Sequence, residues 1–346
     1  TGPLKDSPVV INMSLGGPFP VTPVRRAIEY AHSKNVLVVA AAGNNGQGRV
    51  SYPARYANVL AVAATQYDES TTFYSNWGKE IDIAAPGGNV RVDQNGDGKP
   101  DGILQNTITG GGRGNGYLWF MGTSMAAPHV AGIAALVVGA GVTRPEAVEK
   151  VLLDSARKPK GAAMDGHNDH YGSGIADAQA ALNKAKRSRG IASLGLGTSL
   201  ALLGLAGGRR RQRLPGVHLG ALGAALVFGA SGLFFLPLLG APAWLSDSPF
   251  GSGVLFSLAG LLGPGGQGNP VLWSLLLPLS LVGLLYGVRP LRPTLAGLCF
   301  GVAGAILFAA CALPAEIRFV PDVLDRVWLV ANAMVATVLG SLVVKR

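Results

Sequence analysis

Short hydrophobic runs alternate with segments of helical periodicity in the first half of the chain. Val, Ile, Leu and Ala fill these runs, as is typical of buried parallel strands. Four runs are expected to be strands: 8–12, 36–43, 58–65 and 80–87. Apolar residues at helical spacing predict helices at 21–35, 123–140 and 143–156. The alternation predicts an α/β fold, with a parallel sheet and helices on both faces.

Long hydrophobic stretches replace this alternation in the second half. Each has about the 17–25 residues with which a helix crosses a bilayer. They cover 191–207, 217–240, 271–288, 294–313 and 327–344. We therefore expect a domain at 1–185, a basic juxtamembrane linker at 186–190, and an all-α transmembrane region of about five helices at 191–346. In an alternative that stays open, 191–207 is the only anchor and the rest is a separate module.

The composition agrees with two unlike halves. Only 14% of all residues are charged, against roughly 25% in ordinary soluble domains. Residues 1–190 hold 19 Lys and Arg and 15 Asp and Glu, whereas residues 191–346 hold 10 and 4. The net charge of +10 therefore lies largely at the ends of apolar stretches, where membrane topology explains it. We expect membrane lipid as a partner and no nucleic acid.

Basic residues also suggest an orientation. If the N-terminal domain is outside, the inner segments hold eight Lys and Arg and the outer ones hold six. Because cytoplasmic loops carry the excess of Lys and Arg, we expect a multi-pass protein whose N-terminal domain is extracytoplasmic.

Ser124 is a candidate nucleophile. It lies in GTSMAAPHVAG (122–132), where a Gly-containing turn meets the start of a predicted helix. Helix-start amides favour the negative charge that develops when a serine attacks, although a helix-capping serine is the simpler alternative. Asn44 follows Gly43 at the end of the second predicted strand, where it could donate to an oxyanion or merely form a turn.

Several segments together resemble one family. These occur in order: MSLGG (13–17), AAAGNNG (40–46), SYPARYANVLAVAA (51–64), IDIAAPGG (81–88) and GTSMAAPHVAG (122–132). Over about residues 8–185 the chain resembles the C-terminal half to two-thirds of the catalytic domain of subtilisin-like serine proteases, the subtilases or peptidase S8 family. The last string is highly specific. The resemblance implies a serine endopeptidase acting on polypeptides through an acyl-enzyme.

The resemblance also implies roles for matching residues. Ser124 matches the catalytic serine, and Asn44 matches the side-chain donor to the oxyanion. The segment that pairs with an extended peptide substrate matches Ser14, Leu15 and Gly16. The wall of the primary specificity pocket matches Ala41, Ala42 and Gly43, and its base matches Ser51. Pro53 matches a proline that is cis in the family, and His129 matches a structural histidine.

Two parts of the family's triad have no counterpart here. A DTG-like motif with the Asp and a GHGTH-like motif with the His should precede MSLGG, and neither occurs. We therefore expect the catalytic Asp and His, with the first strands of the sheet, to lie upstream in a longer protein. The upstream part of the same protease domain is then a required partner, and the chain by itself is expected to be inactive.

A second motif suggests a metal. In DQNGDGKPD (93–101), Asp93, Asn95 and Asp97 occupy the first, third and fifth positions of a calcium loop, and Asp101 occupies the ninth. Leu104 stands at the twelfth position, where a bidentate Glu would be. We expect a structural calcium site of modest affinity, with a solvated acidic turn as the alternative.

The sequence leaves two alternatives to an endopeptidase. The same groove could serve a non-catalytic peptide-binding or assembly module on a membrane anchor. A transporter or channel is disfavoured, because the interiors of the apolar stretches hold no Asp, Glu, Lys or Arg.

Overall fold

The computed structural model describes residues 9–109, 111–112, 114–159, 166–206, 216–230, 275–312 and 324–345. The chain divides into two compact units, unit 1 (residues 1–185) and unit 2 (residues 186–346). Each unit is described by itself.

The core of unit 1 is a four-stranded parallel sheet. Its strands are β1 (Val9–Met13), β2 (Val36–Ala41), β3 (Val59–Thr65) and β4 (Ile83–Pro86), in the spatial order β1-β2-β3-β4. β2 and β3 are buried almost throughout, which explains their continuous apolar sequence. The predicted parallel α/β fold is confirmed, and the fourth strand begins at Ile83, later than the hydrophobic run suggested.

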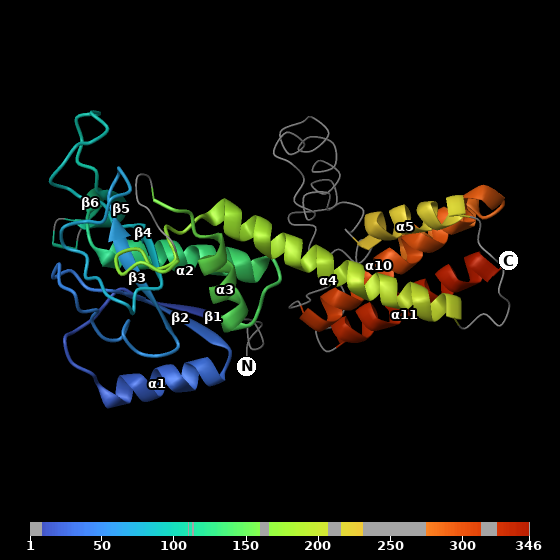
Figure 1. Ribbon diagram of the computed structural model, residues 1–346, viewed down its shortest axis with the longest axis horizontal. Coiled ribbons are helices and arrows are strands. Elements are labelled where there is room, and N and C mark those ends of the chain that lie inside the picture. The colour runs from blue at the N-terminus through green and yellow to red at the C-terminus, as the bar shows by residue number, and fades with distance from the viewer. Residues whose placement is uncertain are drawn as a thin grey trace. The chain divides into compact units, whose positions relative to one another are not determined.

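Helices cover both faces of this sheet (Figure 1). α1 (Thr22–Ser33) packs Ile28 into a core with Val38 and Ala40 of β2. α2 (Thr123–Gly139) and α3 (Pro145–Ser155) pack on a second core that contains Leu37 and Val39. Alternate residues of β2 therefore point to opposite layers, as the two-residue period of a strand requires.

An antiparallel hairpin precedes α2, in a stretch for which the sequence predicted no regular structure. Its strands are β5 (Ile103–Thr109) and β6 (Gly114–Phe120). The glycines at 110–116 obscured this hairpin in the sequence, and in the structure the residues of β5 alternate between exposed and partly buried. Such alternating burial is typical of a half-exposed strand.

α4 (Ala178–Ala206) is one continuous helix that begins in unit 1 and continues into unit 2. Residues 186–190, expected as a linker, are part of this helix. Unit 2 further contains α5 (Gly216–Ala230), α9 (Leu276–Leu285), a 3-10 turn η2 (Arg289–Leu291), α10 (Arg292–Ala312) and α11 (Asp325–Lys345).

Two of the helical segments described in unit 2 are long and apolar enough to cross a membrane: Arg289–Cys311 and Asp325–Val343. They match the predicted spans 294–313 and 327–344. The predicted span 191–207 corresponds to a shorter apolar helix, Ile191–Leu203. The remaining two are described only over α5 and α9, and residues 231–240 and 271–274 lie outside the described residues. Five spans are thus not confirmed.

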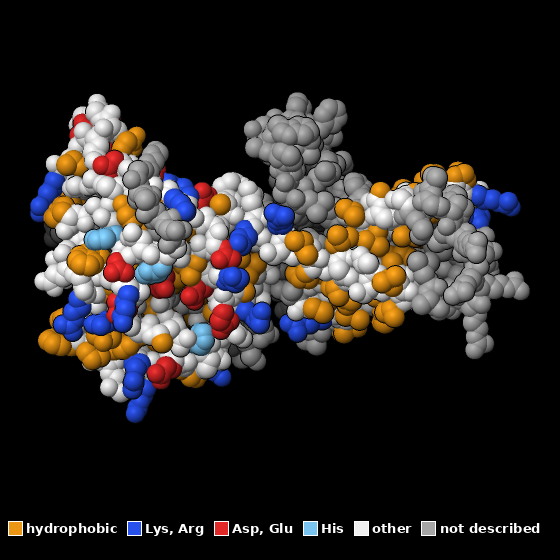
Figure 2. All heavy atoms as spheres, viewed as in Figure 1, with side chains coloured by type: hydrophobic (Ala, Val, Ile, Leu, Met, Phe, Trp, Pro, Cys, Tyr) orange, Lys and Arg blue, Asp and Glu red, His pale blue; other side chains and the backbone are white. Residues whose placement is uncertain are grey.

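Glycines bring the helices of unit 2 close together. A Cβ on Gly304 of α10 would lie 2.4 Å from the backbone nitrogen of Gly197 in α4. A Cβ on Gly297 would lie 2.2 Å from the carbonyl oxygen of Leu222 in α5. α10 therefore packs against both neighbours backbone to backbone, and side chains larger than hydrogen would separate the helices. In Figure 2 the described surface of unit 2 is largely hydrophobic, whereas charged side chains are scattered over unit 1.

Candidate active site

Ser124 lies in the first turn of α2, directly after the turn that ends the hairpin. The N-cap residue, Gly122, has a φ of 152°, which a residue with a side chain rarely adopts. Its N–H donates to the carbonyl oxygen of Gly87, just beyond β4, at 3.0 Å. The helix start is therefore fixed to the carboxyl end of the sheet, where ligands bind in open α/β folds.

Two hydrogen bonds link Ser124 and Ser14, each from the hydroxyl of one residue to the backbone carbonyl oxygen of the other. Ser124 Oγ donates to the carbonyl oxygen of Ser14 at 3.3 Å, and Ser14 Oγ donates to the carbonyl oxygen of Ser124 at 2.8 Å. Asn12 Nδ2 donates to Ser14 Oγ at 3.0 Å. The residues after β1, predicted to bind substrate, and the predicted nucleophile are thus brought together.

Thr123 holds the side chain of Asn44 in one orientation. The Asn44 Oδ1 atom accepts the Thr123 backbone N–H at 2.8 Å and the Thr123 hydroxyl at 2.8 Å. A backbone N–H can only donate, so the atom facing it must be the amide oxygen. The Nδ2 group is left as the donor, and no acceptor for it lies among the described residues. The side chain is exposed and can donate to a bound ligand.

A second donor lies beside it. The backbone N–H of Ser124 is in the first turn of α2, where no helical carbonyl can accept it. Within the described part of the chain nothing else accepts it either. Two unpaired N–H groups near the nucleophile form the kind of site that stabilises an oxyanion.

A base for Ser124 is missing from the described residues. The only acceptor found there for its hydroxyl is the Ser14 carbonyl oxygen. The histidines of unit 1 lie elsewhere. His129 contacts the Met125 carbonyl oxygen at 2.7 Å, His167 contacts that of Ile81 at 2.8 Å, His170 stacks on Trp77, and His32 lies 3.4 Å from Glu146.

Among the residues predicted to line a specificity pocket, the two alanines expose almost no side chain. The side chains of Ala41 and Ala42 are 4% and 0% exposed and pack into the two cores, so only their backbone could line a pocket. A Cβ on Gly43 would lie 2.4 Å from Ser51 Oγ and 2.3 Å from Asn76 Nδ2. Glycine is therefore required at position 43, where φ is also positive.

Known proteins resemble parts of this chain. Residues 4–174 match the family model described as the Subtilase family, Peptidase_S8, and residues 210–346 match a domain of unknown function, DUF5942. Residues 4–174 form a subtilase domain. The matched range includes the GTSMAAPHVAG motif (122–132), whose Ser124 lies in the first turn of α2.

Curated relatives of this subtilase domain are proteases. M-protease of Shouchella clausii is 40% identical over 172 residues, which cover 50% of this chain and 39% of the relative. Subtilisin Savinase of Lederbergia lenta is 40% identical over 172 residues, 50% of this chain and 55% of the relative. Extracellular protease of Xanthomonas campestris pv. campestris is 42% identical over 180 residues, which cover 51% of this chain and 28% of the relative. Among solved structures, proteases from Pseudoalteromonas arctica PAMC 21717 align at 36% identity with a TM-score of 0.45, covering 51% of each chain. The chain thus spans about half the length of these relatives or less.

Asn76 links the segment around Ala42 to Ser51 in the subtilase domain. This residue was not identified from the sequence. Its side chain is buried, donates to the carbonyl oxygen of Ala42 and to Ser51 Oγ, both at 3.2 Å, and accepts the backbone N–H of Asn45 at 2.9 Å. An asparagine between a serine and a tryptophan in SNWG (75–78) was the only available signal.

An isolated antiparallel bridge anchors the segment predicted to bind substrate. Gly17 and Tyr52 exchange two backbone hydrogen bonds, of 2.8 and 2.9 Å, and a Cβ on Gly16 would lie 2.9 Å from the Tyr52 carbonyl oxygen. Leu15 remains 57% exposed and is available to a ligand. The Tyr52–Pro53 bond is cis, as the resemblance implies.

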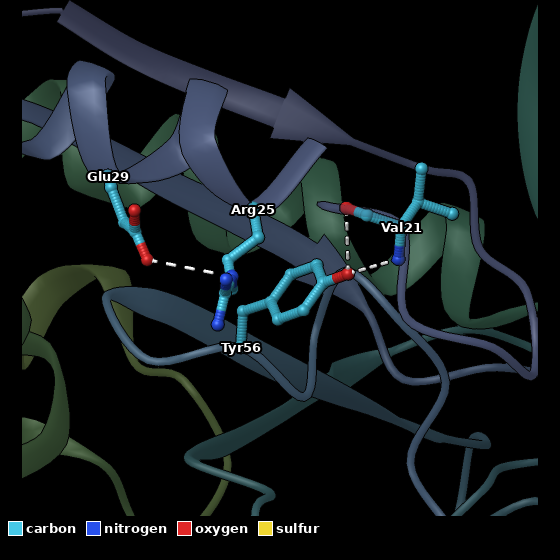
Figure 3. Close-up of polar contacts among 4 residues, drawn as sticks. All are labelled: Val21, Arg25, Glu29 and Tyr56. Atoms are coloured by element: carbon cyan, nitrogen blue, oxygen red, sulfur yellow. Dashed lines mark hydrogen bonds and ion pairs between the residues drawn. The ribbon is translucent and has the colours of Figure 1, made fainter. Parts of the chain in front are cut away.

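Tyr56 fixes the far end of the same segment (Figure 3). Its hydroxyl accepts the Val21 N–H at 2.6 Å and donates to the Val21 carbonyl oxygen at 3.1 Å. The ring also packs on Tyr52, with centroids 4.7 Å apart. The exposed Arg25–Glu29 pair nearby, at 3.8 Å, adds little because water screens it. Nothing in the sequence pointed to Tyr56.

The predicted calcium ligands do not form a metal cluster. No group of three or more His, Cys, Asp or Glu side chains that could hold a metal ion occurs in the described part of the chain. Asp93 instead accepts the backbone N–H groups of Gly96, Asp97 and Gly98, at 2.8, 3.2 and 2.9 Å. Asn95 accepts the Asp97 N–H at 2.9 Å, and Asp101 accepts the Gln94 N–H. These side chains therefore close an acidic turn through backbone N–H groups of the same loop, which was the alternative expected from the sequence.

Proposed function

We propose that this protein is a membrane-anchored subtilisin-like serine endopeptidase whose peptidase domain faces the extracytoplasmic side. Ser124 is its nucleophile. Ser124 Oγ attacks the peptide carbonyl carbon while its proton passes to a base, and the carbon–nitrogen bond then breaks as the base gives that proton to the departing amine. Water hydrolyses the resulting serine ester and regenerates Ser124.

The orientation of Asn44 carries this proposal. Because Thr123 occupies its oxygen twice, the Asn44 amide can only present N–H groups to a ligand. Together with the Ser124 N–H, it would stabilise the negative charge that the carbonyl oxygen acquires during attack. A serine placed only to cap a helix would need no such donor beside it.

The proposed reaction also needs a base that accepts the Ser124 proton. We infer that an upstream part of the same protease domain supplies the catalytic Asp and His. The exposure of β1 supports this inference. Val9 and Ile11 are 46% and 39% exposed, and β1 lies at an open edge of the described sheet. Apolar strands of parallel sheets are normally covered on both sides.

The membrane anchor is supported by unit 2. A core helix of a soluble protein can be as long and apolar as α10, so length alone decides little. Backbone contacts at Gly297 and Gly304 are typical of helices packed in lipid. α11 also exposes apolar residues along one face: Val327, Met334, Val335, Val338 and Leu342.

A second candidate is a non-catalytic peptide-binding module. It is favoured by the bond from Ser124 Oγ to the Ser14 carbonyl oxygen, which occupies the hydroxyl proton. Peptide hydrolysis by the full-length protein separates the two candidates. The endopeptidase proposal requires cleavage that is lost in Ser124→Ala, whereas a binding module retains peptide affinity without cleavage.

A further inference from the structure

One face of the β5–β6 hairpin gathers large hydrophobic side chains. In the antiparallel register, Leu104 is opposite Trp119, Asn106 is opposite Tyr117, and Ile108 is opposite Asn115. Directly opposite residues of such a pair share a face, as do alternate residues along each strand. We call these six residues the hairpin face.

The hairpin face is exposed and uncharged. Leu104 is 52% exposed, Ile108 70%, Tyr117 65% and Trp119 38%. The two asparagine side chains are also exposed. A contiguous patch of exposed apolar side chains is typical of a binding surface.

The hairpin is held at its base. The Asn89 N–H donates to the carbonyl oxygen of Asp101 at 2.7 Å, and the chain packs so closely at Gly102 that a Cβ there would lie 2.8 Å from the Cβ of Trp119. A two-stranded hairpin is unstable alone, so this attachment explains how the hairpin face is presented.

The hairpin face lies next to the nucleophile in the chain. β6 ends at Phe120, and Met121, Gly122 and Thr123 lead directly to Ser124. Trp119 is five positions before Ser124, so their Cα atoms are at most about 18 Å apart. The base of the hairpin also lies at the β4 edge of the sheet, whereas Ser14 follows β1 at the opposite edge.

We propose that the hairpin face binds apolar side chains of the polypeptide substrate on the side of the cleaved bond away from Ser14. This inference rests on the proposed function for its substrate. It extends the binding surface several residues beyond the nucleophile. The substrate class is an extended polypeptide with apolar, uncharged residues in that part.

The chemistry of the hairpin face favours a polypeptide over lipid. Asn106 and Asn115 carry amides between the hydrophobic side chains, and no partner for either amide lies among the described residues. A peptide backbone can bond both amides, whereas acyl chains would leave them unsatisfied at a cost in free energy.

Peptide affinity tests the inference without requiring catalysis. Full-length protein carrying Ser124→Ala is titrated, with fluorescence anisotropy, against a labelled peptide rich in Leu and Val and a same-length peptide rich in Ser and Gly. Tyr117→Ser and Ile108→Ser should each weaken binding of the apolar peptide about tenfold, as expected for central contact residues. Tyr30→Ser, which alters a 66% exposed tyrosine on α1, is the matched control and should leave binding unchanged.

Equal affinity of the hairpin variants and the Tyr30→Ser control for the apolar peptide would overturn the inference. So would unchanged peptide affinity together with reduced tryptophan quenching by brominated phosphatidylcholine vesicles in Trp119→Phe, which would assign the surface to lipid. Failure of the proposed function is read separately, as absence of peptide cleavage by the protein with Ser124 intact.

Discussion

Ser124 and Ser14 hold each other through reciprocal hydroxyl-to-carbonyl hydrogen bonds, of 3.3 and 2.8 Å. The bond from Ser14 fixes the first turn of α2 against the segment that is proposed to bind substrate. The bond from Ser124 is the weaker by distance, and it must break before the hydroxyl proton can move to a base. The pair therefore couples the position of the nucleophile to that of the substrate-binding segment.

Thr123 is expected to act on catalysis through Asn44. Thr123→Val keeps the shape of the side chain but removes the hydroxyl that donates to Asn44 Oδ1 at 2.8 Å. Loss of one such bond costs about 1 kcal/mol, so kcat of the full-length protein should fall roughly five- to tenfold. Thr123→Ser retains the hydroxyl and should retain kcat. Equal kcat values in the Val and Ser variants would contradict this role.

Tyr56 is expected to affect substrate binding more than the chemical step. Tyr56→Phe keeps the packing on Tyr52 but removes both hydrogen bonds to Val21. The segment 14–21 then loses its attachment at Val21, so KM should rise several-fold while kcat changes little. Tyr30→Phe removes the hydroxyl of an exposed tyrosine and is the control. A fall in kcat without a change in KM would exclude a positioning role.

Asp82 should make unfolding depend on pH. Burial raises its pKa from the ordinary value of 3.8 to about 6, although the Ala61 N–H that it accepts at 2.7 Å opposes the shift. The group therefore stabilises the fold below pH 4, and this contribution is lost as pH rises through about 6. The shift corresponds to at most about 3 kcal/mol.

Asp82→Asn removes this dependence while keeping an oxygen for the Ala61 N–H. Thermal unfolding of the full chain should show the variant gaining stability over wild type at pH 7 and losing that advantage at pH 4. If Asp82→Asn and wild type differ in Tm by the same amount at pH 4 and pH 7, Asp82 titrates normally.

The loop at 93–101 should depend on Asp93 and not on calcium. Asp93→Ala removes the acceptor for the N–H groups of Gly96, Asp97 and Gly98, so these amides should exchange with deuterium faster. A calcium chelator should leave both their exchange and the Tm of wild type unchanged. A clear rise in Tm on adding calcium, abolished by Asp97→Ala, would restore the calcium site expected from the sequence.

The sequence predicted the elements whose pattern is local and strong. Continuous apolar runs identified the four parallel strands, because β2 and β3 are buried on both faces. The GTSMAAPHVAG string located Ser124 at the start of a helix. Both results depend on residues that are close in the sequence.

The remaining features depend on contacts between distant residues. Asn76 reaches back 34 residues to Ala42, and Tyr56 reaches back 35 residues to Val21. Ala41 and Ala42 stay predicted as pocket wall, and the sequence did not show that their side chains point into the two cores and leave only backbone for that role. The spacing of acids at 93–101 predicted calcium, but it did not show that Asp93 accepts backbone N–H groups of the same turn. Periodicity and spacing carry no information on such partners.

Labelling by a fluorophosphonate probe tests the central claim most directly, because it requires an activated serine and a donor for the developing oxyanion. In the full-length protein, wild type should be labelled and Ser124→Ala should not. Asn44→Leu should be labelled about two to three orders of magnitude more slowly, the range known for the matching donor in subtilisin itself. Equal labelling of wild type and Ser124→Ala, or no labelling of the full-length wild-type protein, would contradict the account.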